Sequence, residues 1–241
     1  AFAITTAAAQ STDTSYDGMD PNNVSVTNSD DDSAGITVSP TSGLTTTEAG
    51  GTATFTVVLT SQPSANVVVE LTSGDTGEGT LSATSLTFTS ANWNAGQTVI
   101  VTGVDDDIDD GNQAFAITTA AAQSTDTDYD GIDPTNVSVT NSDDDSAGIT
   151  VSPTSGLTVT EAGGTATFTM VLTSQPSADV VVDLSSSDTG EGTISPNSLT
   201  FTNTNWNTAQ ALTVTGMDDD VHDGDQAITI ITAAAQSTDT D

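Results

Sequence analysis

The sequence predicts an all-β protein built from β-sandwich domains in tandem, and three features carry this prediction. Hydrophobic residues make up 34% of the chain and fall in short alternating runs rich in Thr, Val and Ile, which are typical of strands. Stretches rich in Leu, Glu and Lys that would suit helices are nearly absent. Turn residues separate the runs at short intervals, and the whole pattern recurs at the size of a domain. A parallel α/β fold would need helical crossovers, for which the sequence offers no segment.

The recurring unit is 113 residues long, because Gln10, Gln123 and Gln236 occupy equivalent positions in the motif TAAAQSTDT. A unit of this size is a whole domain and not one turn of a solenoid. We expect residues 1–32 to be the last two strands of a preceding repeat or of a repeat completed by a partner. Residues 33–145 then form a complete repeat, and residues 146–241 form a second repeat without its final strand.

This arrangement, with one complete repeat between two incomplete ones, has two explanations. The chain is either an excerpt from a longer array, cut at an arbitrary register, or a subunit that completes a neighbouring chain by strand addition through residues 1–32. A two-stranded piece is not stable in isolation, so these residues need a partner in either case.

Seven strands are expected in the complete repeat. The first is short, the second alternates before it becomes continuously apolar, and the third follows the turn at 62–64. The fourth alternates, the fifth follows Asn92-Trp93-Asn94, the sixth follows an acidic loop, and the seventh ends at a run of aspartates. Seven short strands between turns predict a β-sandwich. Their expected ranges are 35–38, 52–60, 66–72, 85–89, 97–104, 113–120 and 136–140.

The charge of the chain is entirely negative. It contains 34 acidic residues, one His and no Lys, Arg or Cys, for a formal net charge of −34. The charge rules out nucleic-acid binding, which needs cations on the protein, and it also argues against docking on anionic lipid. Disulfides are excluded as well, and no apolar run reaches the roughly 20 residues of a membrane helix, so we expect no membrane insertion in this segment. Internal salt bridges could form only through His222, so the fold needs another source of stability.

Three runs of the sequence resemble the Calx-beta domain. They are TEAGGTATFTVVLTSQPSANVVVEL, VTGVDDDIDDGNQAFAITTAAA and VSVTNSDDD. The resemblance covers essentially the whole chain and implies an immunoglobulin-like, seven-stranded sandwich. The family takes its name from the calcium-binding domains of sodium–calcium exchangers and recurs in long bacterial surface and adhesion proteins. One departure is that the family's second acidic stretch is thinner here, at 109–113 and 222–226.

Three acidic elements recur in register and are candidate metal ligands. They are a Glu near the start of the repeat, the loop after the fifth strand, and the aspartates that end the seventh strand. The resemblance implies that they meet at one end of the domain. Asp109 is the least suited, because His222 replaces it in the next repeat. The candidate ligands are Glu48, Asp105, Asp106, Asp107, Asp110, Asp143, Asp144, Asp145, Glu161, Asp218, Asp219, Asp220, Asp223, Asp30, Asp31 and Asp32.

Such a constellation indicates a bound cation. Two like charges 4–5 Å apart repel by about 3–4 kcal/mol at an effective dielectric of about 20. Several such pairs rival the net stability of a domain, about 5–15 kcal/mol. Calcium fits best, because it takes six to eight oxygen ligands from flexible loops, whereas magnesium keeps its waters and zinc prefers Cys and His. The alternative, solvated turns that keep the protein soluble, suits isolated acidic residues better than a constellation that recurs in register.

The remaining motifs give weaker evidence for a binding or catalytic site. Residues 126–133 have the alternating acidic spacing of a calcium loop but lack the bidentate Glu of an EF-hand, so an ordinary turn is favoured. Asp75 flanks a Gly-containing turn and is a weaker candidate ligand. Trp93 and Trp206 are expected to pack at the end of the core, the alternative being a sugar-binding role. No catalytic site is expected, since a Ser/His/Asp arrangement would depend on His222, which the other repeat lacks.

The function that we expect is structural. The chain would be a calcium-rigidified repeat array in an extracellular fibre or a bacterial cell-surface adhesin, acting as a spacer or as the filament itself. Only Ser146 and Ala147 separate the terminal aspartates of one repeat from the next, so bound calcium would fix the inter-repeat angle. The expected partners are calcium ions, neighbouring repeats and other copies of the chain in a fibre. Two alternatives stay open: a filament subunit joined by strand complementation through residues 1–32, and a carbohydrate-binding module.

Overall fold

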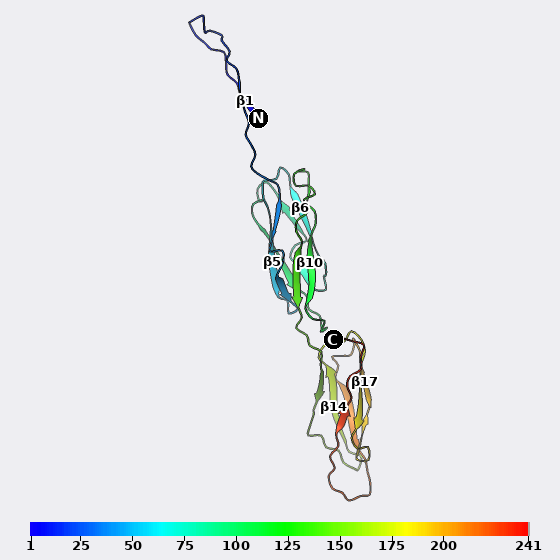
Figure 1. The fold of residues 1–241 in the computed structure, drawn as a ribbon. Coiled ribbons are helices and arrows are strands. Elements are labelled where there is room, and N and C mark those ends of the chain that lie inside the picture. The colour runs from blue at the N-terminus through cyan, green and yellow to red at the C-terminus, as the bar shows by residue number, and fades with distance from the viewer. Residues whose placement is uncertain (241) are drawn as a thin grey trace.

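The computed structural model describes residues 1–240, and within this range the chain forms strands and no helix. Figure 1 shows an N-terminal hairpin followed by two sandwiches arranged end to end. The predicted all-β fold of tandem sandwiches is therefore confirmed. None of the described residues belongs to a helix that is long and apolar enough to cross a membrane.

The first sandwich consists of two facing sheets. One sheet has the order β3-β5-β9-β7, with the bounds Ile36–Ser39, Thr52–Leu59, Gln97–Gly103 and Gly79–Leu81. The other has the order β11-β6-β10-β12-β4, with the bounds Gln123–Ser124, Val67–Ser73, Gln113–Thr119, Val137–Ser142 and Leu44–Thr47. Strand β8 (Ser85–Phe88) pairs with β6 on its other edge.

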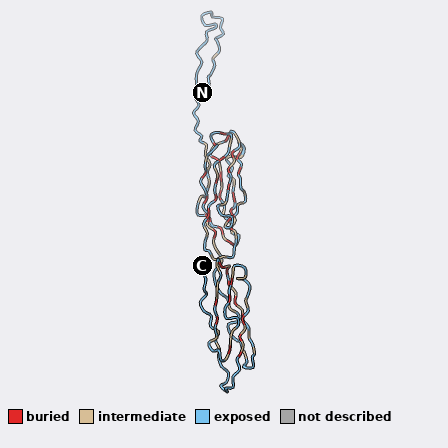
Figure 2. The backbone as a smooth tube through the Cα atoms, turned by 90° about the vertical axis from the view of Figure 1, so that its right-hand side faces the viewer, coloured by how far each residue is buried: buried red, intermediate tan, exposed pale blue. Residues whose placement is uncertain are grey.

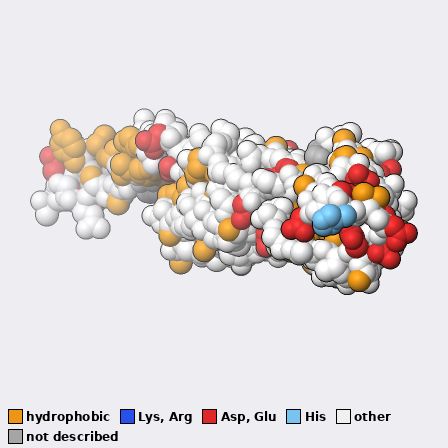
Figure 3. Space-filling model, turned by 90° about the horizontal axis from the view of Figure 1, so that it is seen from below, with side chains coloured by type: hydrophobic (Ala, Val, Ile, Leu, Met, Phe, Trp, Pro, Cys, Tyr) orange, Lys and Arg blue, Asp and Glu red, His pale blue; other side chains and the backbone are white. Residues whose placement is uncertain are grey.

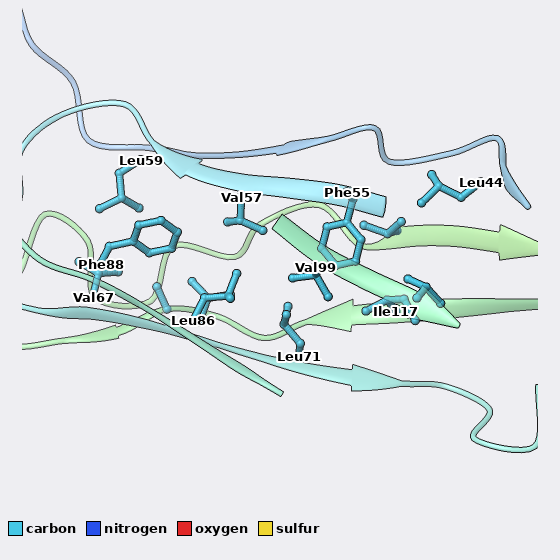
Figure 4. Packing of buried hydrophobic residues seen from close by; sticks show 14 of the residues in the cluster. Leu44, Phe55, Val57, Leu59, Val67, Leu71, Leu86, Phe88, Val99 and Ile117 are labelled. Carbon is cyan, nitrogen blue, oxygen red and sulfur yellow. The ribbon is translucent and has the colours of Figure 1, made fainter. Parts of the chain in front are cut away.

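The core of this sandwich follows from the alternation of apolar residues. Phe55, Val57 and Leu59 on β5 point inward, and each is at most 3% exposed. They meet the inward residues of β6, β8, β9 and β10 in a cluster between the sheets (Figure 4). Thr56 and Val58, which lie between them, face the opposite side of the strand and are half-buried, so the period of two residues separates a core face from an outer face. Trp93 and Trp206 pack against the cores of their repeats, as predicted.

Three short strands were not predicted, and one of them positions the acidic centre. These strands are β4, β7 and β11. Strand β4 is inconspicuous in sequence because one of its two buried positions is Thr46, whose hydroxyl donates to Asn141 Oδ1 at 2.9 Å. It runs parallel to β12, with Thr47 opposite Ser142. The residues that follow the two strands therefore emerge at the same edge of the sheet.

The second sandwich repeats this pattern with fewer strands. Its first sheet has the order β13-β14-β18-β16, with the bounds Ile149–Ser152, Thr165–Leu172, Gln210–Gly216 and Gly192–Ser195. Its second has the order β17-β15-β19, with the bounds Ser198–Phe201, Val180–Ser186 and Ile230–Thr232. Residues 157–160, which correspond to β4, form no strand, and among the described residues no strand pairs with β19 on the side that β12 occupies in the first repeat.

The N-terminal hairpin lies apart from both sandwiches. It pairs β1 (Phe2–Ile4) with β2 (Val24–Val26), with Phe2 opposite Val26. Not one residue of 1–32 is buried, and the segment is pale blue almost throughout in Figure 2.

The two sandwiches contact each other directly at their junction. The Gln175 amide donates to the Asp107 carbonyl at 2.6 Å, and the Ala147 amide donates to Asp109 Oδ2 at 2.8 Å. Ile108 and Asp109 line a small cavity of about 320 Å³ together with residues 147–149 of the second repeat. The acidic loop of the first repeat is therefore also a contact surface for the second.

Candidate metal centre

The centre forms where the parallel strands β4 and β12 end. Glu48 directly follows β4, and Asp143 and Asp145 follow β12. The three carboxylates place one oxygen each within 4.8 Å of the others. The Glu48 amide donates to the Ser142 carbonyl at 3.0 Å, which fixes the two chain segments together. The Glu48 side chain is only 2% exposed, although it carries an ionisable group.

The pKa of the Glu48 carboxyl shows the electrostatic repulsion within the cluster. Burial, together with the charges of Asp143 and Asp106, raises the pKa of Glu48 to about 7, against one hydrogen bond from the Asp144 amide that lowers it. Burial and the Asp143 and Asp107 charges also raise the pKa of Asp145. By contrast, amide donors at Asp145 and Gly111 lower the pKa of Asp143, so this carboxylate stays ionised. A charged Asp143 beside a buried Glu48 is an arrangement that a cation would stabilise.

A second cluster of carboxylates adjoins the first. Glu78, Asp106 and Asp110 place oxygens within 4.8 Å of one another. Glu78 lies in the turn before β7, and the two aspartates lie in the loop after β9. Burial raises the pKa of Glu78, against a hydrogen bond from Asn141 Nδ2 at 3.3 Å. Because the Asp106 charge acts on both Glu48 and Glu78, the two clusters form one acidic centre.

Glu78 is not among the ligands predicted from the sequence, yet it belongs to this cluster. The available signal was that Glu78 and Asp75 recur one repeat later as Glu191 and Asp188. The structure separates the two residues: Glu78 joins the centre, while Asp75 Oδ1 accepts the Gly77 amide at 2.9 Å and closes its own turn.

The second repeat retains only one of these clusters. Glu191, Asp219 and Asp223 come within 4.8 Å of one another and are the equivalents of Glu78, Asp106 and Asp110. Burial raises the pKa of Glu191, as do the charges of Asp223 and Asp219. Glu161, the equivalent of Glu48, is exposed and joins no cluster among the described residues. Figure 3 shows acidic side chains near the imidazole of His222 on this face of the molecule.

The other candidate ligands are placed differently. Asp30, Asp31 and Asp32 form an exposed cluster of their own in the N-terminal segment. Asp144 contributes its backbone amide to Glu48 Oε2 at 3.3 Å, and Asp107 contributes its carbonyl to the junction. The side chains that join no three-residue cluster among the described residues are those of Asp105, Asp107, Asp144, Glu161, Asp218 and Asp220.

The loop at residues 126–133 behaves as a structural turn. Asp126 Oδ2 accepts a hydrogen bond from the Ser64 amide at 2.7 Å, and this hydrogen bond lowers the pKa of Asp126. Asp130 Oδ1 accepts the Ser124 amide at 3.1 Å. Tyr129 is 1% exposed and donates its hydroxyl to the Ser61 carbonyl at 2.6 Å. These contacts favour the interpretation as an ordinary turn.

The donor set of the acidic centre fits a hard divalent cation. All six side chains of the two adjoining clusters offer carboxylate oxygens, and no Cys or His is among them. Calcium takes oxygen ligands of this kind from flexible loops, whereas zinc prefers nitrogen and sulfur. Glu48, Asp143 and Asp145 would hold one ion, and Glu78, Asp106 and Asp110 would hold a second beside it.

In EDTA, we expect the free energy of unfolding of the first repeat to fall as the pH rises from 5 to 8. The folded-state pKa of Glu48, about 7, lies above its ordinary value of 4.5, so the folded state holds a proton that the unfolded state releases in this window. The stabilisation that this proton gives the folded state is complete below about pH 4.5 and is lost as the pH passes 7. The raised pKa of Glu78 acts in the same direction. Urea unfolding of a Trp206→Phe variant, in which Trp93 alone reports, measures it. A rise in stability between pH 5 and 8 in EDTA would contradict the assignment.

The fold and the site define a class of protein, namely tandem immunoglobulin-like sandwiches with a carboxylate centre at the end of a repeat. The chain belongs to the Calx-beta domain family, whose sequence model matches residues 29–145 and 142–240. This confirms the resemblance drawn from the sequence. Domains of this family bind calcium in homologues of the chain. A search of curated protein sequences gave no match.

Solved structures with similarity to the chain include three Calx structures. CBD12 of CALX1.2 is 17% identical, with a TM-score of 0.35, and the alignment covers 84% of this chain and 81% of that chain. CBD12 of CALX1.1, described as a calcium binding domain, is 17% identical with a TM-score of 0.37, covering 82% and 74%. The apo form of Calx CBD1 is 19% identical with a TM-score of 0.35, covering 46% and 96%. The family assignment rests on the sequence match.

Proposed function

We propose that the chain is a calcium-rigidified repeat array that serves as a non-catalytic spacer or stalk in an extracellular fibre or a bacterial cell-surface adhesin. The observation that carries this proposal is the buried Glu48 carboxylate, which is 2% exposed and faces Asp143 and Asp145 in a chain without Lys or Arg. No internal cation of the protein can neutralise these groups, so a bound metal ion would do so.

The position of the acidic centre would link ion binding to the stiffness of the junction between the two repeats. The loop that carries Asp106 and Asp110 also carries Asp107 and Asp109, which hydrogen bond to the second repeat. Calcium bound to this loop would order it on both sides, toward its own repeat and toward the next one. The two-residue linker then leaves little freedom, and the array would become stiff only in calcium.

Calcium is expected to narrow the distribution of distances between the two sandwiches. The chain lacks Cys, so spin labels on Thr80→Cys and Thr200→Cys, two exposed positions, report one defined distance by pulsed electron resonance. The distribution should be broad in EDTA and narrow in calcium. Equal widths in both conditions would contradict the proposal.

Asp109→Ala should broaden this distribution even in calcium, because the Ala147 amide loses its acceptor. Asp109→Asn keeps an oxygen acceptor and is the matched control, with an expected width close to that of the unsubstituted chain. An Asp109→Ala variant as narrow as Asp109→Asn would show that this contact does not set the angle.

A further inference from the structure

The side-chain amide of Asn141 is fully buried next to the acidic centre of the first repeat. Asn141 lies on β12, two residues before Asp143. Its Oδ1 accepts a hydrogen bond from the Thr46 hydroxyl at 2.9 Å. Its Nδ2 donates to the Val104 carbonyl at 3.0 Å and to Glu78 Oε2 at 3.3 Å. The amide therefore uses its oxygen and both hydrogens of its NH2 group.

The three partners of this amide belong to the chain segments that supply the carboxylates. Thr46 lies on β4, two residues before Glu48, and Val104 begins the acidic loop that follows β9. The third partner, Glu78, is itself a member of the second cluster. Strand β12 carries the amide and leads into the aspartates of the first cluster. All four segments of the acidic centre thus meet at one uncharged side chain.

The chemistry of these partners requires an uncharged amide. The Val104 carbonyl and the Glu78 carboxylate both accept hydrogen bonds, so the NH2 group faces them and the oxygen faces the Thr46 hydroxyl. An aspartate would lose both donors and add a buried negative charge beside Glu78. A leucine of similar size would leave the Thr46 hydroxyl and the Val104 carbonyl without this partner.

The backbone of β9 leaves room for the amide. Gly103, the last residue of β9, lies so close to it that a Cβ atom at this position would be 2.5 Å from Asn141 Oδ1. The same Cβ would also collide with the Thr47 carbonyl. A glycine inside a strand is typical of a place where another part of the chain approaches closely. This close packing holds the Asn141 amide against its partners.

We propose that Asn141 is a positioning residue that holds Glu78 and the acidic loop in place for the second metal ion. This role rests on the proposed function, because it concerns how calcium is bound. The amide occupies one lone pair of the Glu78 carboxylate and leaves the others for a cation. Its bond to Val104 fixes the start of the loop that brings Asp106 to the same cluster. Groups that orient a metal ligand in this way typically contribute about 10–100-fold to metal affinity.

The ion at the first cluster should depend on Asn141 much less. The Glu48 amide donates to the Ser142 carbonyl at 3.0 Å, and the Asp145 amide donates to Asp143 Oδ1 at 2.8 Å. These backbone hydrogen bonds hold the carboxylates of the first cluster without help from the Asn141 side chain. Loss of the amide should therefore weaken one ion and spare the other.

The calcium dependence of unfolding tests the proposal. Urea unfolding of the first repeat, reported by Trp93 in a Trp206→Phe chain, is measured over a series of free calcium concentrations. The slope of the free energy of unfolding against the logarithm of the calcium concentration gives the number of ions that the folded repeat binds. We expect a slope of two ions in this reference chain. In Asn141→Leu the slope should fall to one ion, and about 10–100-fold more calcium should be needed to restore the second.

Two further variants keep the test independent of folding. Asn141→Leu combined with Thr46→Val removes both partners of the buried contact, so that neither is left unpaired there. Glu78→Gln removes the ligand but keeps an oxygen acceptor for the amide. Adding Asn141→Leu to Glu78→Gln should not lower the slope again, because the site that the amide positions is already lost.

Asn136→Leu is the matched control at the other end of β12. Asn136 Oδ1 accepts the Thr119 amide at 2.9 Å, far from the carboxylates in the course of the strand. Its replacement should lower the free energy of unfolding by the same amount at every calcium concentration and leave the slope unchanged.

The outcomes separate the role of Asn141 from the proposed function. A slope that falls in both Asn141 variants but not in Asn136→Leu would support the role. A reference chain whose unfolding does not depend on calcium would overturn both proposals. A calcium-dependent reference chain with an equal slope in the Asn141 variants would overturn the role alone, since Asn141 would then only support the fold. A further fall in slope on adding Asn141→Leu to Glu78→Gln would also overturn it.

Discussion

Millimolar calcium is expected to raise the melting temperature of the first repeat by about 10 °C or more, and Glu48→Gln is expected to remove most of this gain. A ligand at about 100 times its Kd adds about 2.7 kcal/mol to the free energy of unfolding, and each kcal/mol moves the melting temperature of a domain of this size by about 4–8 °C. Gln keeps an oxygen acceptor for the Asp144 amide but supplies no carboxylate. Thermal unfolding followed by Trp93 in a Trp206→Phe chain measures the shift, with magnesium as the comparison ion.

The same substitution should have the opposite sign in EDTA. At pH 8 a buried Glu48 carboxylate faces Asp143 without a counter-ion, and the neutral amide removes this repulsion. Glu48→Gln should therefore stabilise the metal-free first repeat. Glu161→Gln, at the exposed equivalent position, is the matched control and should change neither condition in the monomer. A Glu48→Gln chain that gains as much from calcium as the unsubstituted chain would show that the ion binds elsewhere.

Ile117→Ala should destabilise the first repeat by about 2–5 kcal/mol, the usual cost of removing a large aliphatic side chain from a packed core. Ile117 is fully buried on β10 between β6 and β12. Ile230→Ala removes the same atoms at the equivalent position of the second repeat, but there the side chain is only half-buried at the open edge of β19. The second substitution should cost much less. Urea unfolding of the two single-Trp backgrounds gives each value separately.

Equal costs at the two positions would contradict this description of the repeats. They would mean that the second repeat is as well closed around Ile230 as the first is around Ile117.

The sequence predicts most of the fold because its apolar pattern repeats. The apolar runs at 52–60 and 66–72 predict the long strands observed at Thr52–Leu59 and Val67–Ser73, and the 113-residue period relates the two sandwiches. The short strand β4 escapes prediction because its buried Thr46 is polar, and only the pairing with Asn141 makes that position favourable. Its parallel contact with β12 joins segments almost 100 residues apart, which no local pattern encodes.

The sequence predicts the chemistry of the candidate site better than it predicts which residues belong to the site. The recurring Asp runs and Glu48 indicate a carboxylate centre, and the resemblance to Calx-beta domains points to calcium. Which aspartates face inward depends on the course of the loop, so Asp106 and Asp110 join the cluster while the adjacent Asp107 bonds through its backbone to the next repeat. Glu78 comes from a separate turn and is placed there by the β7–β9 pairing. The exposure of Glu161 depends on a neighbouring strand and cannot be read from the recurring motif.

A calorimetric titration of calcium into the 241-residue chain, at physiological salt and in excess magnesium, shows whether the carboxylate centre around Glu48 binds calcium. Exposed carboxylates are screened under these conditions, whereas a buried centre built around Glu48 is not. We expect saturable calcium binding that survives magnesium, is strongly weakened by Glu48→Gln and is unchanged by Glu161→Gln. Weak heats that disappear with salt and are identical in all three chains would contradict it, and would identify the aspartate runs as solvated turns.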